Sequence, residues 1–368
     1  MNIEQIVKDE VKTAKKAVHG GDVWAHNRGL VDFSSNVNSL GPSKKVLKTL
    51  KESFWKLTYY PDPDSNELKD ALSEYLGVEN DNITVGNGST ELIKNFLELV
   101  IKRGDKVIIP EPTFSEYEVY SRLYGADVNH IYSRREDGFS INVQEIVEKI
   151  EDKTKVVFIC NPNNPTGKIL DQQGLEKIIS SARDHSAFVF VDEAYIEFTE
   201  SESMSQKIEE YDNLFVLRSI TKFFSLPGIR TGYGVGEKRS INYLEKIRVP
   251  WNVNILAQAV AIESLRDEEF IKTSKNLITK EKDFFFKEIS KLNGVEILSS
   301  DANFFLIDLK ESRIRSNQMK ERLIEKGLLI RDCSSFNGLD DSFIRISVRG
   351  REENSLLVDS LGKVISGA

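Results

Sequence analysis

Short apolar runs alternate with amphipathic segments between residues 82 and 235. The runs are nearly continuous in apolar character, which is typical of strands that are buried on both faces of a parallel sheet. The segments between them, such as 175–185, have the spacing of helices that cover such a sheet. We therefore expect an α/β fold with a large, mostly parallel sheet. The predicted strands are 83–85, 106–109, 128–132, 155–160, 187–191, 214–217 and 231–235.

The segments on either side of this region predict further helices and a smaller α/β lobe. Helices are predicted over 43–56 and 65–76, and a long helical run over 255–292 follows Pro250. The C-terminal part then predicts a strand, a helix, two strands and a helix, at 303–309, 316–326, 328–330, 343–348 and 352–364.

A chain of 368 residues is long enough for a substantial core that is divided between two lobes. We expect residues 1–45 to form a loop-rich N-terminal arm that packs with the small domain. Residues 46–250 are predicted to form the large domain, and residues 251–368 the small C-terminal domain.

The charge and the apolar content argue against several classes of protein. A formal net charge of -8 without a basic block disfavours nucleic acid as a partner. The apolar runs are too short to span a bilayer, and the first residues lack the apolar segment of a secretion signal. The two cysteines, Cys160 and Cys333, suggest no disulfide framework, so we expect both to be small buried residues in a cytoplasmic protein.

One lysine follows a predicted strand and lies close in sequence to two hydroxyl residues and an arginine. Lys222 comes after Ser219 and Thr221, and Arg230 lies eight residues further on. The amine can act as a nucleophile, while hydroxyl groups and a guanidinium can hold a phosphate. Pyridoxal phosphate (PLP) requires this combination, because a Schiff base to lysine and an anion site hold it in place. On this stretch alone, a surface lysine is the alternative.

Small and polar residues follow other predicted strands, where α/β sheets bind ligands. Gly88, Ser89 and Thr90 begin a helix, and N–H groups at a helix start suit a phosphate. A routine N-cap turn is the alternative there. Phe114 is placed to lie against a pyridine ring, although packing within a loop is the commoner role. Asn164 is presented by the rigid loop Asn-Pro-Asn-Asn-Pro-Thr-Gly.

Asp192 and Tyr195 follow the strand predicted over 187–191. A buried carboxylate is costly unless it meets a cation, and a protonated pyridine nitrogen would be such a cation. Tyr195 is spaced to donate a hydrogen bond to the phenolic oxygen of the same ring. A helix-capping aspartate is the alternative.

Two arginines lie in or beside apolar strands near the C-terminus. Apolar residues flank Arg331 and Arg345, so each needs an anionic partner, and the guanidinium fork suits a carboxylate or a phosphate. Arg349 and Arg351 lie in a more polar run, and we expect them to be solvated.

In this order, these motifs resemble those of the fold-type I PLP-dependent enzymes, the aspartate-aminotransferase superfamily, over essentially the whole chain. The resemblance implies that Lys222, Asp192 and Tyr195 are catalytic, and that no metal ion takes part. It also implies a homodimer in which Tyr60 reaches the cofactor phosphate of the neighbouring subunit. The expected PLP-binding set is Gly88, Ser89, Thr90, Phe114, Asn164, Asp192, Tyr195, Ser219, Thr221, Lys222, Arg230 and Tyr60.

Within the superfamily, the chain looks like the branch that holds histidinol-phosphate aminotransferase and L-threonine-O-3-phosphate decarboxylase. Both act on phosphorylated amines, which would account for Arg331 beside Arg345, the arginine expected to bind the substrate's carboxylate or its equivalent. His19-Gly-Gly-Asp, the stretch 32–41 and the Gly-Asn-Gly-Ser-Thr-Glu-Leu-Ile turn favour the decarboxylase. Ser39 departs from the usual proline, which weakens the second of these signals.

The decarboxylase reading implies conversion of L-threonine O-3-phosphate to (R)-1-aminopropan-2-ol phosphate in cobalamin biosynthesis. Its alternative is transamination of histidinol phosphate with 2-oxoglutarate in histidine biosynthesis. Asn38 and His19 are candidates for phosphate contacts, although His19 is equally compatible with a plain arm residue. A PLP-sensing regulator would need a DNA-binding module, and no helix-turn-helix segment or basic patch precedes the fold.

Overall fold

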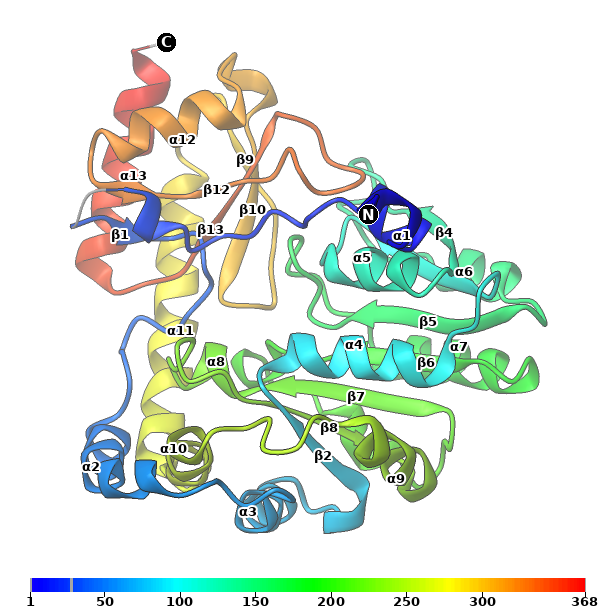
Figure 1. Cartoon of the computed structure of the whole chain (residues 1–368). Helices are drawn as coiled ribbons and strands as arrows, with labels where there is room; N and C mark the ends of the chain where they lie inside the picture. The colour runs from blue at the N-terminus through cyan, green and yellow to red at the C-terminus, as the bar shows by residue number, and fades with distance from the viewer. Residues whose placement is uncertain (1, 27–28, 368) are drawn as a thin grey trace.

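The computed structural model describes residues 2–26 and 29–367, and a large and a small sheet form its centre (Figure 1). The strands of the large sheet pair in the order β2-β8-β7-β6-β5-β3-β4. They are β2 (Ile83–Gly86), β3 (Lys106–Glu111), β4 (Asp127–Tyr132), β5 (Thr154–Cys160), β6 (Phe188–Asp192), β7 (Leu214–Ser219) and β8 (Gly232–Gly236). All neighbours pair in parallel except β8, which is antiparallel to both β2 and β7. The prediction of a mostly parallel sheet is therefore confirmed.

Helices cover both faces of the large sheet, and alternate residues of one strand enter different apolar cores. Val189 and Val191 pack in one core, whereas Phe190 packs in the other. This burial on both faces explains why the strands read as continuous apolar runs. One core receives α4 (Ser89–Val100), α5 (Glu116–Leu123) and α9 (Lys238–Ile247), and the other receives α3 (Asn66–Leu76), α6 (Val143–Lys149) and α7 (Gln172–Asp184).

The small sheet is antiparallel, in the order β12-β13-β10-β9. Its strands are β9 (Glu296–Ile297), β10 (Phe304–Asp308), β12 (Arg331–Asp332) and β13 (Phe343–Ser347), and its neighbours include α11 (Glu268–Ile289), α12 (Ser316–Ile324) and α13 (Arg351–Ser366). A separate pair joins the N-terminal part to the C-terminal part, since β1 (Val31–Asp32) runs parallel to β11 (Leu328–Leu329).

Two helix predictions differ from the structure. The run predicted over 255–292 is two helices, α10 (Ile255–Leu265) and α11, because Asp267 caps the start of α11 by accepting a hydrogen bond from Phe270 N. The helix predicted over 43–56 is α2 (Lys44–Glu52) followed by a separate 3-10 turn, Phe54–Thr58. In both cases a short break interrupts the helical run, which apolar spacing alone does not reveal.

Arg349, which we expected to be solvated, is mostly buried. Its guanidinium forms an ion pair with Glu353 at 2.9 Å and donates to Asp32 O at 2.9 Å. Because Asp32 belongs to β1, this arginine ties the N-terminal part to the C-terminal part. Arg351 is the more exposed of the two, and it pairs with Glu281 at 2.9 Å.

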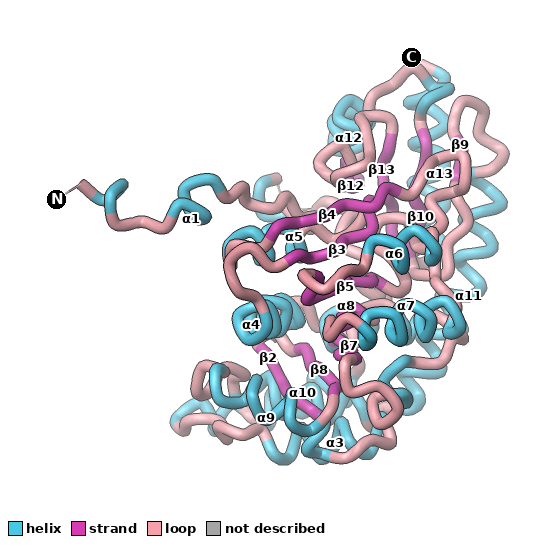
Figure 2. The backbone as a smooth tube through the Cα atoms, turned by 90° about the vertical axis from the view of Figure 1, so that its right-hand side faces the viewer, coloured by secondary structure: helices cyan, strands magenta, loops and turns pink. Residues whose placement is uncertain are grey.

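The N-terminal segment extends outward from the body beyond α5 (Figure 2). Its short helix α1 (Asp9–Thr13) packs near α5, and Glu10 forms an ion pair with Arg103. Among the described residues, no helix has both the length and the apolar character that crossing a membrane requires.

The tight contact between β8 and β7 generates a stability prediction. A Cβ atom on Gly234 would lie 2.2 Å from Cζ of Phe215, so Gly234→Ala must displace a buried ring. We expect a loss of about 1–3 kcal/mol in the free energy of unfolding, measured by urea denaturation. Gly228→Ala is the control, because a Cβ there meets nothing within 4 Å. Equal losses in the two variants would contradict the packing argument.

Candidate active site

A cavity of about 390 Å³ lies at the carboxyl ends of β5, β6 and β7 and is bounded on its other side by β12 and β13. This volume suits a cofactor or a small ligand. Most of the residues predicted from the sequence line it, although they come from distant parts of the chain. They are His19, Ser89, Thr90, Phe114, Asn164, Asp192, Tyr195, Ser219, Thr221, Lys222, Arg230, Arg331 and Arg345.

Lys222 lies on the single-turn helix α8 (Ile220–Phe223), directly after β7. Ser219 caps this helix by accepting a hydrogen bond from Thr221 N, and Lys222 Nζ donates to Ser35 O at 3.0 Å. Burial lowers the pKa of Lys222 to about 8, and the positive charges of Arg345 and Arg230 act in the same direction. A substantial fraction of the amine is therefore neutral, and hence nucleophilic, near physiological pH.

The N-terminus of α4 forms one end of the cavity and has the features of a phosphate site. Ser89 and Thr90 bring hydroxyl groups and unpaired helix N–H groups to this end. Gly88 does not line the cavity, but a Cβ on it would lie 2.5 Å from Nη2 of Arg230. Its φ of +81° also favours glycine. The missing side chain thus makes room for the guanidinium beside the helix start.

Two more observations support an anion site at this end. Ser219 Oγ and Thr221 Oγ1 lie 2.8 Å apart, so two hydroxyls converge on the same place. Arg230 holds a left-handed backbone conformation, with φ of +61°, and its Nη1 donates to Pro227 O at 3.1 Å. A non-glycine residue in this conformation is uncommon, and such strain is concentrated at functional sites.

The other polar groups of the cavity fit a pyridine ring. The Asp192 carboxylate is buried, and its Oδ1 accepts a hydrogen bond from Ala194 N at 2.9 Å. Tyr195 Oη accepts one from Asn36 Nδ2 at 3.3 Å, and Asn164, which also lines the cavity, accepts a hydrogen bond from Arg345 through its Oδ1. Phe114 supplies an aromatic face. Together with Lys222 and the helix start, this set of donors and acceptors fits PLP.

Arg331 and Arg345 lie directly opposite each other on β12 and β13. Both side chains line the cavity, and both residues are buried. Neither forms an ion pair with any of the described residues, and Arg345 Nε has no hydrogen-bond partner there. Burial lowers the pKa of Arg331, and the nearby charge of Arg345 adds to this effect. Facing like charges are destabilising, so this wall is built for an anion.

The N-terminal part crosses this end of the cavity, and it does so through backbone contacts that the sequence did not reveal. Arg331 donates to Val18 O at 2.6 Å and to His19 O at 2.9 Å, while Arg345 donates to Ser34 O at 2.5 Å. The imidazole Nε2 of His19 lies 2.7 Å from Glu116 Oε1. Lining residues absent from the predicted set include Val18, Gly20, Ser34, Ser35, Glu116 and Phe336.

Besides Gly88, two predicted residues do not line the cavity. The Asn38 amide is buried and donates to Phe223 O at 2.9 Å and to Ser274 Oγ at 2.8 Å. Asn38 N also donates to Lys222 O, so this residue braces the backbone of the lysine from outside the cavity. Tyr60 is largely exposed, and its ring lies 4.7 Å from that of Trp251.

Both cysteines are buried and free, as predicted. Cys160 lines the cavity beside Asp192, where burial and that neighbouring charge raise the pKa of the thiol. A thiol with a raised pKa is a poor nucleophile. Cys160 therefore contributes to the wall of the cavity and does not act as a nucleophile.

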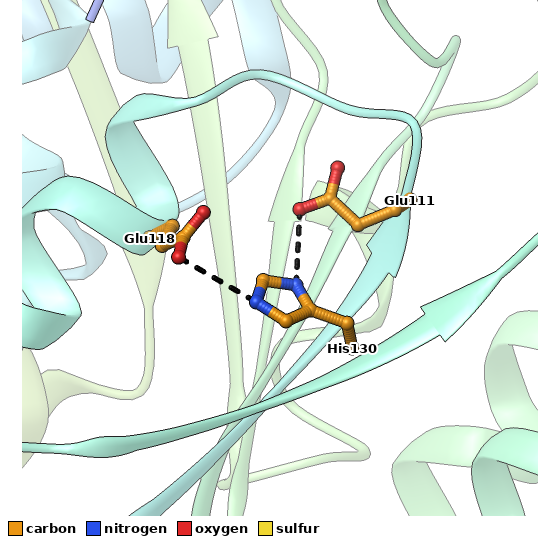
Figure 3. A group of neighbouring side chains, drawn as sticks. All are labelled: Glu111, Glu118 and His130. Atoms are coloured by element: carbon orange, nitrogen blue, oxygen red, sulfur yellow. Dashed lines mark ion pairs between the residues drawn. The ribbon is translucent and has the colours of Figure 1, made fainter. Parts of the chain in front are cut away.

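A second group of titratable side chains lies beside the loop that carries Phe114 (Figure 3). His130 Nδ1 is 3.2 Å from Glu111, and its Nε2 is 3.5 Å from Glu118. These contacts raise the pKa of His130 to about 9. Because the two ring nitrogens face different carboxylates, the geometry is that of an imidazolium held between two anions. Glu111 also accepts from Thr113 N at 2.9 Å and so braces the loop.

The comparison with protein families decides the classification. Residues 28–361 match the family described as "Aminotransferase class I and II". The chain belongs to this family. Its members are PLP-dependent enzymes, and the cavity residues have the donors and acceptors for that cofactor.

Relatives with two different names match this chain. A histidinol-phosphate aminotransferase from Methanocaldococcus jannaschii is 35% identical, with 99% of each chain covered. A protein from Caldanaerobacter subterraneus subsp. tengcongensis, provisionally named threonine-phosphate decarboxylase, is 36% identical. That match covers 96% of this chain and 95% of the relative.

Solved structures agree with this classification. The histidinol-phosphate aminotransferase from Clostridium acetobutylicum matches with a TM-score of 0.86 at 33% identity, covering 92% of this chain and 100% of that one. The same enzyme from Sinorhizobium meliloti, in complex with PLP, gives 0.88 at 21% identity, with 98% of each chain covered. Aspartate aminotransferase from Thermus thermophilus gives 0.85 at 21% identity, covering 97% and 99%. The last two comparisons establish an aspartate-aminotransferase-like fold.

The lowered pKa of Lys222 generates a prediction about PLP attachment. In PLP-free protein, the rate at which added PLP becomes trappable by borohydride on Lys222 should rise through about pH 8, because the neutral amine is the reactive form. Arg345→Gln should shift this midpoint upward, since one nearby positive charge is lost. Peptide mapping by mass spectrometry identifies the lysine.

Arg351→Gln is the control for this titration, because it removes an arginine that pairs with Glu281 and does not line the cavity. Its midpoint should equal that of the unmodified protein. Adduct on a different lysine, or the same upward shift in both variants, would contradict the assignment.

Proposed function

We propose that this protein is a PLP-dependent aminotransferase whose amino substrate carries a phosphate, with histidinol phosphate as the first candidate. The observation that carries the proposal is the pair of buried arginines that face each other across β12 and β13. They form one wall of the cavity whose other residues fit PLP. A substrate with a phosphate, or a dicarboxylate such as 2-oxoglutarate, supplies the negative charge that this wall lacks.

PLP, when bound, supplies an electron sink for a bond at the substrate's Cα atom. Each of the cavity residues around it has a separate role. Lys222 holds the cofactor and, once free, carries a proton on Nζ to and from Cα. Asp192 holds a proton at the pyridine nitrogen, and the Asn164–Tyr195 pair contacts the ring oxygen. The start of α4, with Arg230, binds the cofactor phosphate.

Orientation at Cα decides between transamination and decarboxylation. Transamination would break the Cα–H bond of the substrate, so that bond would have to face Lys222 Nζ, whereas decarboxylation would break the bond from Cα to the carboxylate. Arg331 and Arg345 set this orientation, because they hold the anionic groups of the substrate.

The decarboxylation of threonine phosphate is the second candidate. The sequence favours it through the His19-Gly-Gly-Asp motif, and residues 18–20 line the cavity next to Arg331. A relative that is 36% identical carries that name. The matches at 35% and 33% identity, one a relative and one a solved structure, carry the aminotransferase name, and this is why we place transamination first.

Parallel assays distinguish the two reactions. We expect glutamate from histidinol phosphate and 2-oxoglutarate, and no carbon dioxide from threonine phosphate. Histidinol without its phosphate should lose about 100-fold or more in kcat/KM, because charge-assisted bonds contribute about 1.5–3 kcal/mol each. Arg331→Ala should cause a similar loss, whereas Arg351→Ala should not. Carbon dioxide release without glutamate formation would select the decarboxylase instead.

The surface around Tyr60 supports a homodimer. Several large apolar side chains are exposed there, and a patch of this kind on an otherwise charged protein is typical of an interface. They are Phe54, Trp55, Leu57, Tyr59, Tyr60, Val249 and Trp251. We infer that this patch packs against a second copy of the chain and that Tyr60 reaches the partner's cofactor phosphate, since Tyr60 is exposed and does not line its own cavity.

Mixing two inactive variants tests the shared site. Tyr60→Ala and Lys222→Ala should each have low activity alone. In a hybrid dimer, one site combines an intact lysine with an intact tyrosine, so an equal mixture after subunit exchange should recover about one quarter of the unmodified activity. Activity no higher than the mean of the separate variants would contradict a tyrosine that is shared between subunits.

A further inference from the structure

Tyr117 lies behind the cavity wall and contacts the carboxylate of Asp192. It belongs to the first turn of α5, and its side chain is fully buried. Its hydroxyl donates to Asp192 Oδ2 at 2.6 Å, which is short for a hydrogen bond between side-chain oxygens. Tyr117 is not one of the cavity-lining residues, and neither the sequence motifs nor the tasks assigned above include it.

The direction of this hydrogen bond follows from its surroundings. Burial, together with the charge of Asp192, raises the pKa of Tyr117 well above its ordinary value. The phenol therefore keeps its proton and acts as the donor. Asp192 Oδ1 accepts a second hydrogen bond from Ala194 N, so each carboxylate oxygen has one donor from the protein.

These donors oppose the effect of burial on Asp192. Burial raises the pKa of the Asp192 carboxyl, whereas the bonds from Tyr117 and Ala194 N act to lower it. A buried carboxyl without donors takes up a proton and becomes neutral. A neutral Asp192 would no longer favour the positive charge on a pyridine nitrogen. Tyr117 provides the only side-chain donor to Asp192 among the described residues.

Aromatic packing prevents the phenol from turning away. The Tyr117 ring stacks on Phe158 with centroids 4.7 Å apart and an interplanar angle of 11°. Phe114 meets it edge-on at 5.6 Å and 81°. Phe114 also lines the cavity, where its ring is placed to lie against the cofactor. The residue that would contact the cofactor ring and the residue that supports Asp192 therefore come from one short segment.

We propose that Tyr117 is a positioning residue for the cofactor: its phenol holds the Asp192 carboxylate anionic and aimed at the pyridine nitrogen. This inference rests on the proposed function, since it takes PLP as the ligand. Removal of the phenol makes Asp192 a stronger base, and the proton it shares with the ring nitrogen then moves toward the carboxylate.

The test compares Tyr117→Phe with the unmodified holoenzyme by NMR of PLP labelled at the ring nitrogen. We expect the nitrogen signal to move toward that of an unprotonated pyridine. We also expect kcat to fall about tenfold while KM stays within about twofold, the effect of one hydrogen bond to a charged group. In an Asp192→Asn background, the same substitution should change kcat by less than about twofold. Tyr120→Phe, which removes a hydroxyl from the same helix, should leave the signal in place.

A fluorinated tyrosine at position 117 keeps the donor, so it should recover most of kcat, and the nitrogen signal should move further toward the protonated pyridine as the phenol becomes more acidic. If Tyr117→Phe does not fold, a series of increasingly acidic fluorotyrosines decides the matter, and a signal independent of phenol acidity overturns the inference. Absence of PLP from Lys222 in the unmodified protein would overturn the proposed function itself. If PLP is bound to Lys222 but its nitrogen signal is the same in Tyr117→Phe as in the unmodified enzyme, only the role of Tyr117 is overturned.

Discussion

Parallel pairing of β5, β6 and β7 brings their carboxyl ends to one edge of the large sheet, and the site depends on this arrangement. Cys160 pairs with Asp192 across β5 and β6, and the start of α8 follows β7 at the same edge. The lysine, the carboxylate and the asparagine loop thus face one cavity although they come from three separate connections. The antiparallel β8 adds the helix start of α4 at this edge, because its Gly232 packs against Ser89. Ligand sites of α/β proteins form where strand ends converge in this way.

Electrostatics explains why this cavity suits anionic ligands. Lys222, Arg230, Arg331 and Arg345 all line it, and their positive charges repel one another. Burial lowers the pKa of the lysine, and the positive charges of Arg345 and Arg230 lower it further. Asp192 and Glu116 are the two buried carboxylates among the lining residues, and hydrogen bonds from Tyr117 and Ala194 N hold the Asp192 carboxylate in place. Two anionic groups, one on the cofactor and one on the substrate, would relieve this repulsion. Burial and the same excess of positive charge keep the amine partly neutral, so the charges that suit the cavity to anions also favour the reactive form of the lysine.

The small sheet and the N-terminal part complete the cavity by contacts between residues that are far apart in the chain. Arg331 binds the carbonyls of Val18 and His19, Arg345 binds that of Ser34, and Arg349 binds that of Asp32. Three arginines of the C-terminal part therefore hold one N-terminal segment by its backbone. Because backbone carbonyls accept these bonds, the side-chain motifs of this segment, such as His19-Gly-Gly-Asp, do not reveal them in the sequence.

The sequence by itself determined the fold class, the positions of most strands, and the residues that resemble a PLP site. It could do so because buried parallel strands need continuous apolar runs and because Lys222, Asp192 and Asn164 each follow such a run directly. Only the tertiary structure decided which side chains meet across long separations. The break at Asp267, the facing of Arg331 and Arg345, the bracing role of Asn38 and the bond from Tyr117 to Asp192 depend on packing between elements. Local spacing carries no information on such contacts, since the free energy that selects them comes from burial in the assembled fold.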